Sequence, residues 1–304
     1  MSMLPFDDRD GAIWMNGQLH DWRDSKVHVL THGLHYGSCV FEGERVYNGQ
    51  IFKRDEHHQR LHDSARIMGF DVPYSVAEIN DAAQQVIEAN GIENGYVRPV
   101  AWRGSEMMGV SAQKNSINVA IAAWQWPAYF SPEARMEGIR MQISDWKRPA
   151  PDTAPVKSKA AGLYMICTLS KHAAEAAGYN DALMMDYRGR IAEATGANIF
   201  LVQNGELHTP VPDCFLDGIT RRTVIGLAHE HGYKVHERAI MPEELAQTDE
   251  VFITGTAVEV TPVREIGPYS FTVGETTRTL LRAFDDLVQR RDSRTAHASV
   301  SAAE

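Results

Sequence analysis

Cysteine is scarce in this chain of 304 residues. The three cysteines, Cys39, Cys167 and Cys214, lie far apart in the sequence. They form no Cys-x-x-Cys pair for zinc or redox chemistry, and their number excludes an even-numbered disulfide framework. This usage is typical of a reducing compartment, so we expect a cytoplasmic protein.

The chain also lacks long apolar runs and an excess of positive charge. No apolar stretch approaches the roughly 20 residues that cross a bilayer, and the acidic residues from Asp7 to Asp10 do not resemble a signal peptide. The formal net charge is −10 and the pI is near 5.7. Nucleic acids and anionic membranes attract basic proteins, so we expect neither as a partner and expect small molecules instead.

Hydrophobic residues make up 43% of the sequence, which is enough for a large core or for two. The Asn48-Gly49 pair between two apolar runs predicts a hairpin. Apolar periodicity predicts helices at 55–68, 75–91, 163–177, 220–231 and 275–290. Strands are expected at 12–17, 27–30, 46–52, 96–102, 117–124, 138–145, 182–186, 191–194, 198–203, 234–238 and 250–254. This clustering of strands and helices favours an α+β fold with largely antiparallel sheets.

An aromatic, proline-containing stretch follows Trp124 and indicates a connection between two domains. We expect a smaller N-terminal α/β domain at 1–126 and an interdomain loop at 127–135. A larger C-terminal domain with antiparallel sheets should occupy 136–290. The small, polar residues at 291–304 predict a disordered tail.

Lys159 lies in "VKSKAAGLY", beside Lys157 and between a proline-rich connection and an apolar helix. A lysine that forms imines must be partly neutral, which burial and a neighbouring cation both promote. Tyr164 follows five residues later, after Gly162, and could place a phenol beside the amine. A solvated surface lysine is the alternative interpretation.

Glu193 interrupts the apolar run "IAEATGANIF". A carboxylate buried in such a run needs a partner, whereas an exposed bulge residue does not. Both interpretations stay open on the sequence.

Two turns combine glycine with threonine, "LDGITRRT" at 216–223 and "ITGTAVEVTP" at 253–262. Backbone N–H groups in such turns, and at the start of the helix that follows the first one, form anion sites. The alternative for Thr220 is a helix cap. The spacing is not that of a nucleotide P-loop.

Tyr96 and Arg98 alternate in "YVRP", so a strand would place both on one face as a reader of carboxylates. A cross-strand surface pair is the alternative. Arg60 lies on the polar side of a predicted helix, where most arginines are solvated. The nearby His57, His58 and His62 lack a Glu-x-x-His companion, so we expect no metal site.

Eight blocks occur in a characteristic order: "HGLHYGSCVFEG", "EHHQRLHDSAR", "YVRP", "MMGV", "KSKAAGLY", "AEATGANIF", "GITR" and "GTAVEVTP". Together they resemble the fold-type IV pyridoxal-phosphate enzymes and, within them, the branched-chain aminotransferases. The resemblance covers nearly the whole chain. It implies a two-domain fold like that of D-amino-acid aminotransferase. It also implies ping-pong transfer of the amino group from L-leucine, L-isoleucine or L-valine to 2-oxoglutarate.

The resemblance implies roles for residues that bind pyridoxal 5′-phosphate. Lys159 would form the Schiff base and carry the proton, Glu193 would face the pyridine nitrogen, and Tyr164 would bond the phenolic oxygen of the ring. The phosphate would be held by Arg60, Ile219, Thr220 and Thr256.

Substrate-binding residues follow from the same resemblance. Tyr96 and the backbone of Thr256 and Ala257 would take the α-carboxylate, and Arg98 with Tyr36 would take the second carboxylate of glutamate. The apolar pocket would consist of Phe41, Trp126, Tyr129 and Val110. Because Tyr36 and Val110 would come from the neighbouring subunit, the resemblance implies at least a homodimer and leaves a hexamer open.

Four residues depart from the family pattern, Ala161, Leu163, Ala197 and Asp217, and none of them is a cofactor contact in the roles above. They bear on substrate range rather than on catalysis. A D-amino-acid or R-selective amine transaminase shares the lysine, the glutamate and the phosphate ligands. An aminodeoxychorismate lyase should lack the Tyr96 and Arg98 pair, and a non-catalytic binding protein would not need Lys159 together with Glu193.

Overall fold

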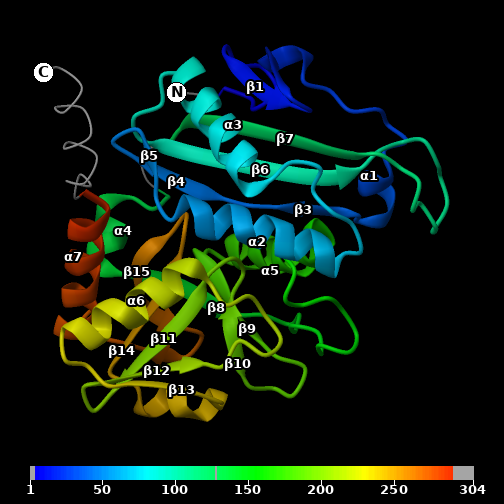
Figure 1. Ribbon diagram of the computed structural model, residues 1–304. Helices are drawn as coiled ribbons and strands as arrows, with labels where there is room; N and C mark the ends of the chain where they lie inside the picture. Colours follow the sequence, from blue (N-terminus) through cyan, green and yellow to red (C-terminus); the bar gives the residue numbers. More distant parts are fainter. Residues whose placement is uncertain (1–3, 127–128, 290–304) are drawn as a thin grey trace, which may run out of the picture.

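The structure is a computed structural model that describes residues 4–126 and 129–289. It contains two β-sheets, and helices α2 and α5 lie between them (Figure 1). The first sheet has seven strands from the N-terminal part of the chain, and the second has nine strands from the C-terminal part. The mixed α+β class expected from the sequence is therefore confirmed.

The first sheet is antiparallel in every pairing of its seven strands. Its strand order is β2-β1-β7-β6-β4-β5, and β3 also pairs with β6. The strands are β1 (Ala12–Met15), β2 (Gln18–Asp21), β3 (Cys39–Phe41), β4 (Glu44–Tyr47), β5 (Gln50–Ile51), β6 (Gly95–Arg103) and β7 (Ile117–Gln125). Helices α1 (His32–Tyr36), α2 (Arg54–Ile67) and α3 (Val76–Ala89) pack against this sheet.

The second sheet has the order β10-β9-β8-β15-β14-β11-β12-β13. Its strands are β8 (Ile139–Ile143), β9 (Asp181–Met185), β10 (Ile191–Ala194), β11 (Asn198–Gln203), β12 (Glu206–Pro210), β13 (Val235–Arg238), β14 (Glu250–Gly255), β15 (Glu259–Ile266) and the short β16 (Tyr269–Ser270). Strand β10 also pairs with β11, between Glu193 and Asn198. This extra pairing closes six strands, β10 to β9, β8, β15, β14 and β11, into a ring.

Helices α4 (Pro132–Glu137), α5 (Tyr164–Ala176), α6 (Ile219–Glu230) and α7 (Glu275–Gln289) accompany the second sheet. Three of its pairings are parallel, β8 with β9, β8 with β15 and β12 with β13. The expectation of largely antiparallel sheets is thus confirmed, but the parallel pairs were not predicted.

Most expected elements lie within a few residues of their predicted bounds, including the hairpin, where Asn48 and Gly49 have φ values of 51° and 78°. The strand expected at 27–30 is wrong, because this segment has no strand partner and Val29 is 71% exposed. Strands β2, β3, β12, β15 and β16 were not predicted. Helix α4 begins inside the expected loop at 127–135, of which residues 127 and 128 lie outside the described ranges, as does the tail at 291–304. The division into domains stays a prediction.

No helix within residues 4–126 and 129–289 combines the length and the apolar character needed to cross a membrane. The apolar residues instead form packed cores against the two sheets. Phe200 of β11 and Phe252 of β14 are register partners and fully buried, and their rings stack 4.9 Å apart at 5°. This pair joins the ring of strands to α6 and α7.

Replacing Phe252 with alanine should leave a cavity beside Phe200 and lower the free energy of unfolding by about 3–5 kcal/mol. Thermal and urea unfolding of the full chain would measure this loss. Phe6→Ala is the control, because Phe6 is 47% exposed and should lower stability much less. Equal losses in the two variants would contradict the packing described here.

Candidate active site

One cavity gathers the residues that the sequence assigned to a cofactor. It lies between α2, α5, the ends of β10, β11 and β14, and the start of α6. All seven predicted cofactor residues line it: Arg60, Lys159, Tyr164, Glu193, Ile219, Thr220 and Thr256. Segments that are far apart in the sequence therefore meet at one place.

Backbone contacts fix Lys159 between the two sheets. Its amide N–H donates to Ser64 Oγ of α2 at 3.0 Å, and its carbonyl accepts from the Phe41 amide of β3 at 3.1 Å. Its amine Nζ donates to Tyr164 Oη at 2.7 Å and lies 5.0 Å from the centre of the Phe41 ring. The lysine is therefore not a solvated surface residue.

Burial, and after it the charge of Arg60, lower the pKa of Lys159 to about 8. The neighbouring cation expected from the sequence was Lys157, but Lys157 is exposed, and Arg60 of α2 has this effect instead. Burial also raises the pKa of Tyr164 well above its usual range. At neutral pH the phenol is therefore a neutral hydrogen-bond partner for an amine that is partly deprotonated.

Glu193 is 8% exposed although it lies at an irregular register shift of β10. Its carboxylate is 3.2 Å from Nε of Arg148, which confirms that the buried carboxylate has a partner. Burial raises the pKa of Glu193 to about 7, and the charges of Arg148 and Lys159 act against this rise. The carboxylate can thus hold or accept a proton near neutral pH.

The start of α6 lines the cavity, and so does Arg60 of α2. The first amides of a helix have no partner within the helix, and they attract anions. Gly218 is the residue that precedes the helix, and no side chain caps it, so the capping role considered for Thr220 is wrong. Thr220 lines the cavity instead.

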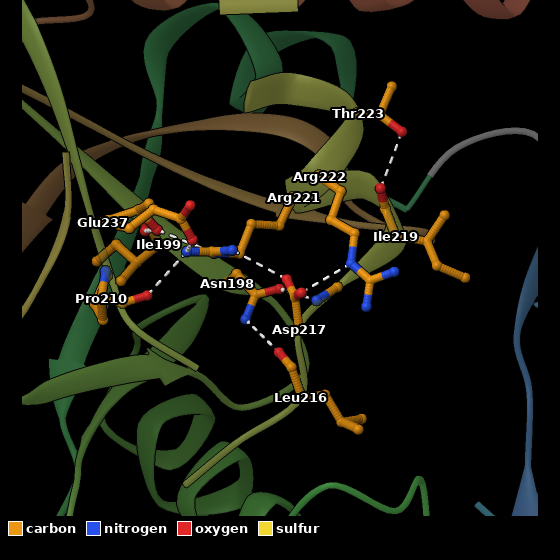
Figure 2. A network of polar contacts seen from close by, with 12 residues as sticks. Asn198, Ile199, Pro210, Leu216, Asp217, Ile219, Arg221, Arg222, Thr223 and Glu237 are labelled. Carbon is orange, nitrogen blue, oxygen red and sulfur yellow. Dashed lines mark hydrogen bonds and ion pairs between the residues drawn. The ribbon is translucent and has the colours of Figure 1, made fainter. Parts of the chain in front are cut away.

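A network of polar contacts holds the turn before α6 (Figure 2). Asn198 Oδ1 accepts from the Gly218 amide at 3.1 Å, and its Nδ2 donates to the Leu216 carbonyl at 3.0 Å. Asp217 accepts from Arg221 Nη1 at 3.0 Å and from Arg222 Nε at 2.8 Å. Asp217, a departure from the family pattern, therefore belongs to this scaffold and does not line the cavity.

Tyr96 and Arg98 lie on one face of β6, as predicted, with Arg98 Nη2 donating to Tyr96 Oη at 3.4 Å. The Arg98 guanidinium also lies over the Phe41 ring, 4.7 Å from its centre. A Cβ built on Gly43 would meet the Tyr96 hydroxyl at 1.8 Å, so the phenol occupies the space that any side chain at position 43 would need. The glycine therefore admits the tyrosine to this site.

Trp126 and Tyr129 extend this aromatic group. The Trp126 ring is 5.3 Å from the Tyr96 ring and stacks on Tyr129 at 6.2 Å. Phe41 contacts Tyr164 edge to face at 4.8 Å. Four of the predicted substrate residues, Phe41, Tyr96, Arg98 and Trp126, thus connect directly to the neighbourhood of Lys159, and Tyr129 lies at their outer end.

None of the eight predicted substrate residues is among those that line the cavity itself, and three of them also lie outside the aromatic group beside Lys159. Ala257 follows Thr256 at the end of β14, whereas Tyr36 and Val110 are on the surface, 46% and 86% exposed. His32 links these two: its ring stacks on Tyr36 at 4.6 Å, and its Nε2 is 2.8 Å from the Gly109 carbonyl. Tyr36 and Val110 therefore belong to one connected surface of this chain.

Several cavity residues were not predicted. Arg148, Thr195 and Asn198 line the cavity, and so do Leu163 and Ala197, which the resemblance did not place at the cofactor. Asn198 could have been recognised from the sequence by the argument used for Glu193. It too is a polar residue in an apolar strand, and a buried amide also needs hydrogen-bond partners. Arg148, in a proline-rich segment, gave no such signal.

The arrangement suits pyridoxal phosphate. An arginine and a helix start can bind the phosphate, a lysine with a pKa near 8 can form an imine, and a buried carboxylate can pair with a pyridine nitrogen. Among the described residues, His57 and His58 of α2 already contact Glu42, Asn80 and Glu44 and do not face this cavity.

Removing the buried amine should stabilise the protein when the cofactor is absent. Below pH 8 the folded state must hold a buried ammonium, and this penalty disappears as the pH rises from about 8 to 10.5. Lys159→Met should therefore raise the free energy of unfolding at pH 7 by up to about 3 kcal/mol, with a smaller gain at pH 10. Urea unfolding measures the gain, and Lys157→Met, at an exposed site, is the control. A difference that does not vary with pH would contradict this prediction.

Comparison with known proteins agrees with this geometry. The family described as "Amino-transferase class IV" matches residues 39–266. The branched-chain-amino-acid aminotransferase of Pseudomonas aeruginosa is 42% identical over 298 residues, which are 96% of each chain. Both lengths are thus almost fully covered.

Solved structures agree as well. The branched-chain amino acid aminotransferase of Escherichia coli is 40% identical, with a TM-score of 0.90 over 94% of this chain and 97% of that chain. The T.th. branched-chain amino acid aminotransferase with pyridoxamine 5′-phosphate is 37% identical, with a TM-score of 0.90 over 93% and 96%. A second structure of the T.th. enzyme is complexed with N-(5′-phosphopyridoxyl)-L-glutamate, at 36% identity and a TM-score of 0.88 over 93% and 96%. The fold-type IV architecture is confirmed, and the chain belongs to the class-IV aminotransferases, among the branched-chain amino acid aminotransferases.

Proposed function

We propose that this protein is a pyridoxal-phosphate transaminase that moves the amino group of L-leucine, L-isoleucine or L-valine to 2-oxoglutarate by a ping-pong mechanism. The observation that carries the proposal is the partly buried amine of Lys159, which has a lowered pKa and shares one cavity with Glu193 and the start of α6. The relatives named above support the substrate class, because they are branched-chain aminotransferases.

Besides Lys159, six residues would hold the cofactor in this proposal. Bound pyridoxal phosphate supplies an aldehyde for imine exchange and a ring that takes up the electron pair released at the substrate Cα. Arg60, the amides of Ile219 and Thr220, and Thr256 bind its phosphate. Glu193 pairs with the pyridine nitrogen, and Tyr164 donates its hydroxyl hydrogen to the phenolic oxygen of the ring.

Lys159 moves the proton. Its amine has a pKa of about 8, so a considerable fraction is neutral near physiological pH and can accept the proton from the substrate Cα. The Tyr164 hydroxyl, 2.7 Å from Nζ, restricts where the free amine points. A general base is most effective when its pKa is near the working pH, which burial and Arg60 achieve here.

The aromatic side chains around Lys159 select the substrate. Tyr96 and the backbone of Thr256 and Ala257 take the α-carboxylate, and the aliphatic side chain lies against Phe41, Trp126 and Tyr129. The same space must also accept glutamate, whose second carboxylate needs a cation. Arg98 is suited to this task, because its buried Nε has no hydrogen-bond partner among the described residues.

A second copy of the chain completes the site. Tyr36 and Val110 are exposed, and so are Val29, Leu34 and Met107 of the same two segments, each at least 45%, with His32 joining the segments. A connected apolar surface of this kind marks a protein interface. From the neighbouring subunit, Val110 would close the apolar pocket and Tyr36 would meet the second carboxylate with Arg98. The proposed unit is a homodimer at least.

The proposed compartment is a reducing cytoplasm. All three cysteines are free, and none has a partner thiol for a disulfide. Burial raises the pKa values of Cys39 and Cys167 to about 11, so both thiols stay protonated and unreactive at neutral pH.

Half-reactions test the substrate class. Mixed with L-leucine, the purified holoenzyme should convert its aldehyde-form absorbance to the amine form at least ten times faster than with D-alanine or R-1-phenylethylamine. A tenfold ratio corresponds to about 1.4 kcal/mol, and a pocket that reads both the configuration at Cα and the α-carboxylate should discriminate against D-alanine and against the carboxylate-free amine by more than this. Lys159→Ala should not complete the conversion. Faster conversion by D-alanine or by the amine would assign the chain to another transaminase of the same fold.

Arg98 separates the two amino-group partners. Arg98→Met should lower kcat/KM for glutamate and 2-oxoglutarate about 10–100-fold, since a charge-assisted hydrogen bond to a carboxylate contributes about 1.5–3 kcal/mol. The half-reaction with L-leucine should change much less. Arg103→Met on the same strand is the control, because Arg103 donates to the carbonyls of Ala112 and Gly69. Equal losses for leucine and glutamate would refute this role.

A further inference from the structure

We propose that Glu42, supported by His57, is a positioning residue that fixes the guanidinium of Arg60 in the orientation needed to bind the cofactor phosphate. This inference rests on the proposed function, because it assumes that Arg60 meets a phosphate. Glu42 connects β3 to β4 and does not line the cavity, so it acts through Arg60.

The geometry is that of a two-point clamp. Arg60 Nε donates to Glu42 Oε1 at 2.7 Å and Nη2 donates to Oε2 at 2.8 Å. His57 Nδ1 lies 2.7 Å from Glu42 Oε2 and holds the carboxylate from the other side. Two parallel bonds between a planar guanidinium and a carboxylate fix the rotation of both groups.

The clamp determines which edge of Arg60 faces the cavity. Because Nε and one Nη2 hydrogen are occupied, Nη1 and the second Nη2 hydrogen are left for an anion. Glu42 and the His57 side chain are almost completely buried, so water does not compete with the clamp. Burial alone would raise the pKa of Glu42, but Arg60 and His57 together hold it well below its usual range, and the carboxylate stays ionised.

Arg60 also borders a second site, outside the cavity, to which its side chain could turn without the clamp. The arginine also lines a surface groove that carries the carboxylates of Asp55, Glu56 and Asp63. The groove carries three carboxylates against one other cation, Arg222. The cavity carries Lys159 and Arg148 against one carboxylate, Glu193. A guanidinium released from Glu42 would therefore be drawn outward. Removing the negative charge of Glu42 would by itself favour phosphate binding. We expect the loss of orientation to outweigh this gain, because an arginine turned toward the groove cannot reach the phosphate.

The chain offers a matched control. Glu44, two residues later, is also fully buried and also contacts a histidine of α2, His58, at 3.1 Å. Within the described ranges, the hydrogen bonds of Arg60 to a carboxylate go to Glu42 and not to Glu44. Substitution of either glutamate therefore removes one buried carboxylate beside one buried histidine, and only one of the two substitutions releases Arg60.

The experiment measures dissociation constants of the full chain, freed of cofactor, for pyridoxal 5′-phosphate and for pyridoxal, which lacks the phosphate. Parent, Glu42→Gln, Glu44→Gln and His57→Gln are compared by absorbance titration. Glu42→Gln should weaken pyridoxal-phosphate binding about tenfold or more, by analogy with the loss of groups that orient metal ligands, and leave pyridoxal binding within about twofold. Glu44→Gln should leave the ratio of the two constants unchanged.

Each result decides the question. An unchanged or tighter affinity of Glu42→Gln for pyridoxal phosphate overturns the inference, and so does an equal loss for both ligands or in both glutamate variants. If Glu42→Gln does not fold, His57→Gln decides: a loss confined to the phosphate ligand supports the clamp, and an unchanged ratio overturns it. A parent that binds no pyridoxal phosphate would refute the proposed function itself.

Discussion

The pairing of Glu193 with Asn198 is the contact on which the active site depends. It joins β10 to β11 and closes six strands into a ring. On one side of this pairing, Glu193 lines the cavity that holds the Lys159 amine. On the other side, Asn198 holds the turn before α6 through both atoms of its amide. A single pairing between strands thus fixes the distance between the Glu193 carboxylate and the start of α6. A phosphorylated pyridine needs both groups, one for its ring nitrogen and one for its phosphate.

Two buried glutamates show how partners determine chemistry. Glu193 has one cation at 3.2 Å, and burial prevails, so its pKa rises to about 7. Glu42 has a bidentate arginine and a histidine, and their attraction prevails, so its pKa falls well below its usual range. The first carboxylate can exchange a proton with a ring nitrogen near neutral pH. The second carboxylate stays ionised, and its two hydrogen bonds restrict the orientation of the Arg60 guanidinium.

The sequence predicted what periodicity and local chemistry determine. Helices α2, α3, α5, α6 and α7 were predicted because each carries an apolar stripe and an identifiable start or end. Strand β15 was not, because Pro262 in a central strand contradicts the usual pattern. All seven expected cofactor residues meet at one cavity, yet the parts played by Arg148 and Glu42 were not expected. Arg148 contacts Glu193 and Glu42 contacts Arg60, in each case a residue of another element of the fold. The residues next to each one in the sequence do not predict these contacts.

Gly43 has a consequence for how the substrate range of this enzyme can change. The Tyr96 hydroxyl occupies the space where a side chain at position 43 would begin. Position 43, in the β3 to β4 connection, is therefore closed to mutation, since even a methyl group would displace the Tyr96 phenol, which we propose binds the α-carboxylate. Trp126 and Tyr129 lie at the other end of the aromatic group, where Tyr129 is 41% exposed. New side-chain preferences can arise there while the recognition of an amino acid as such is retained.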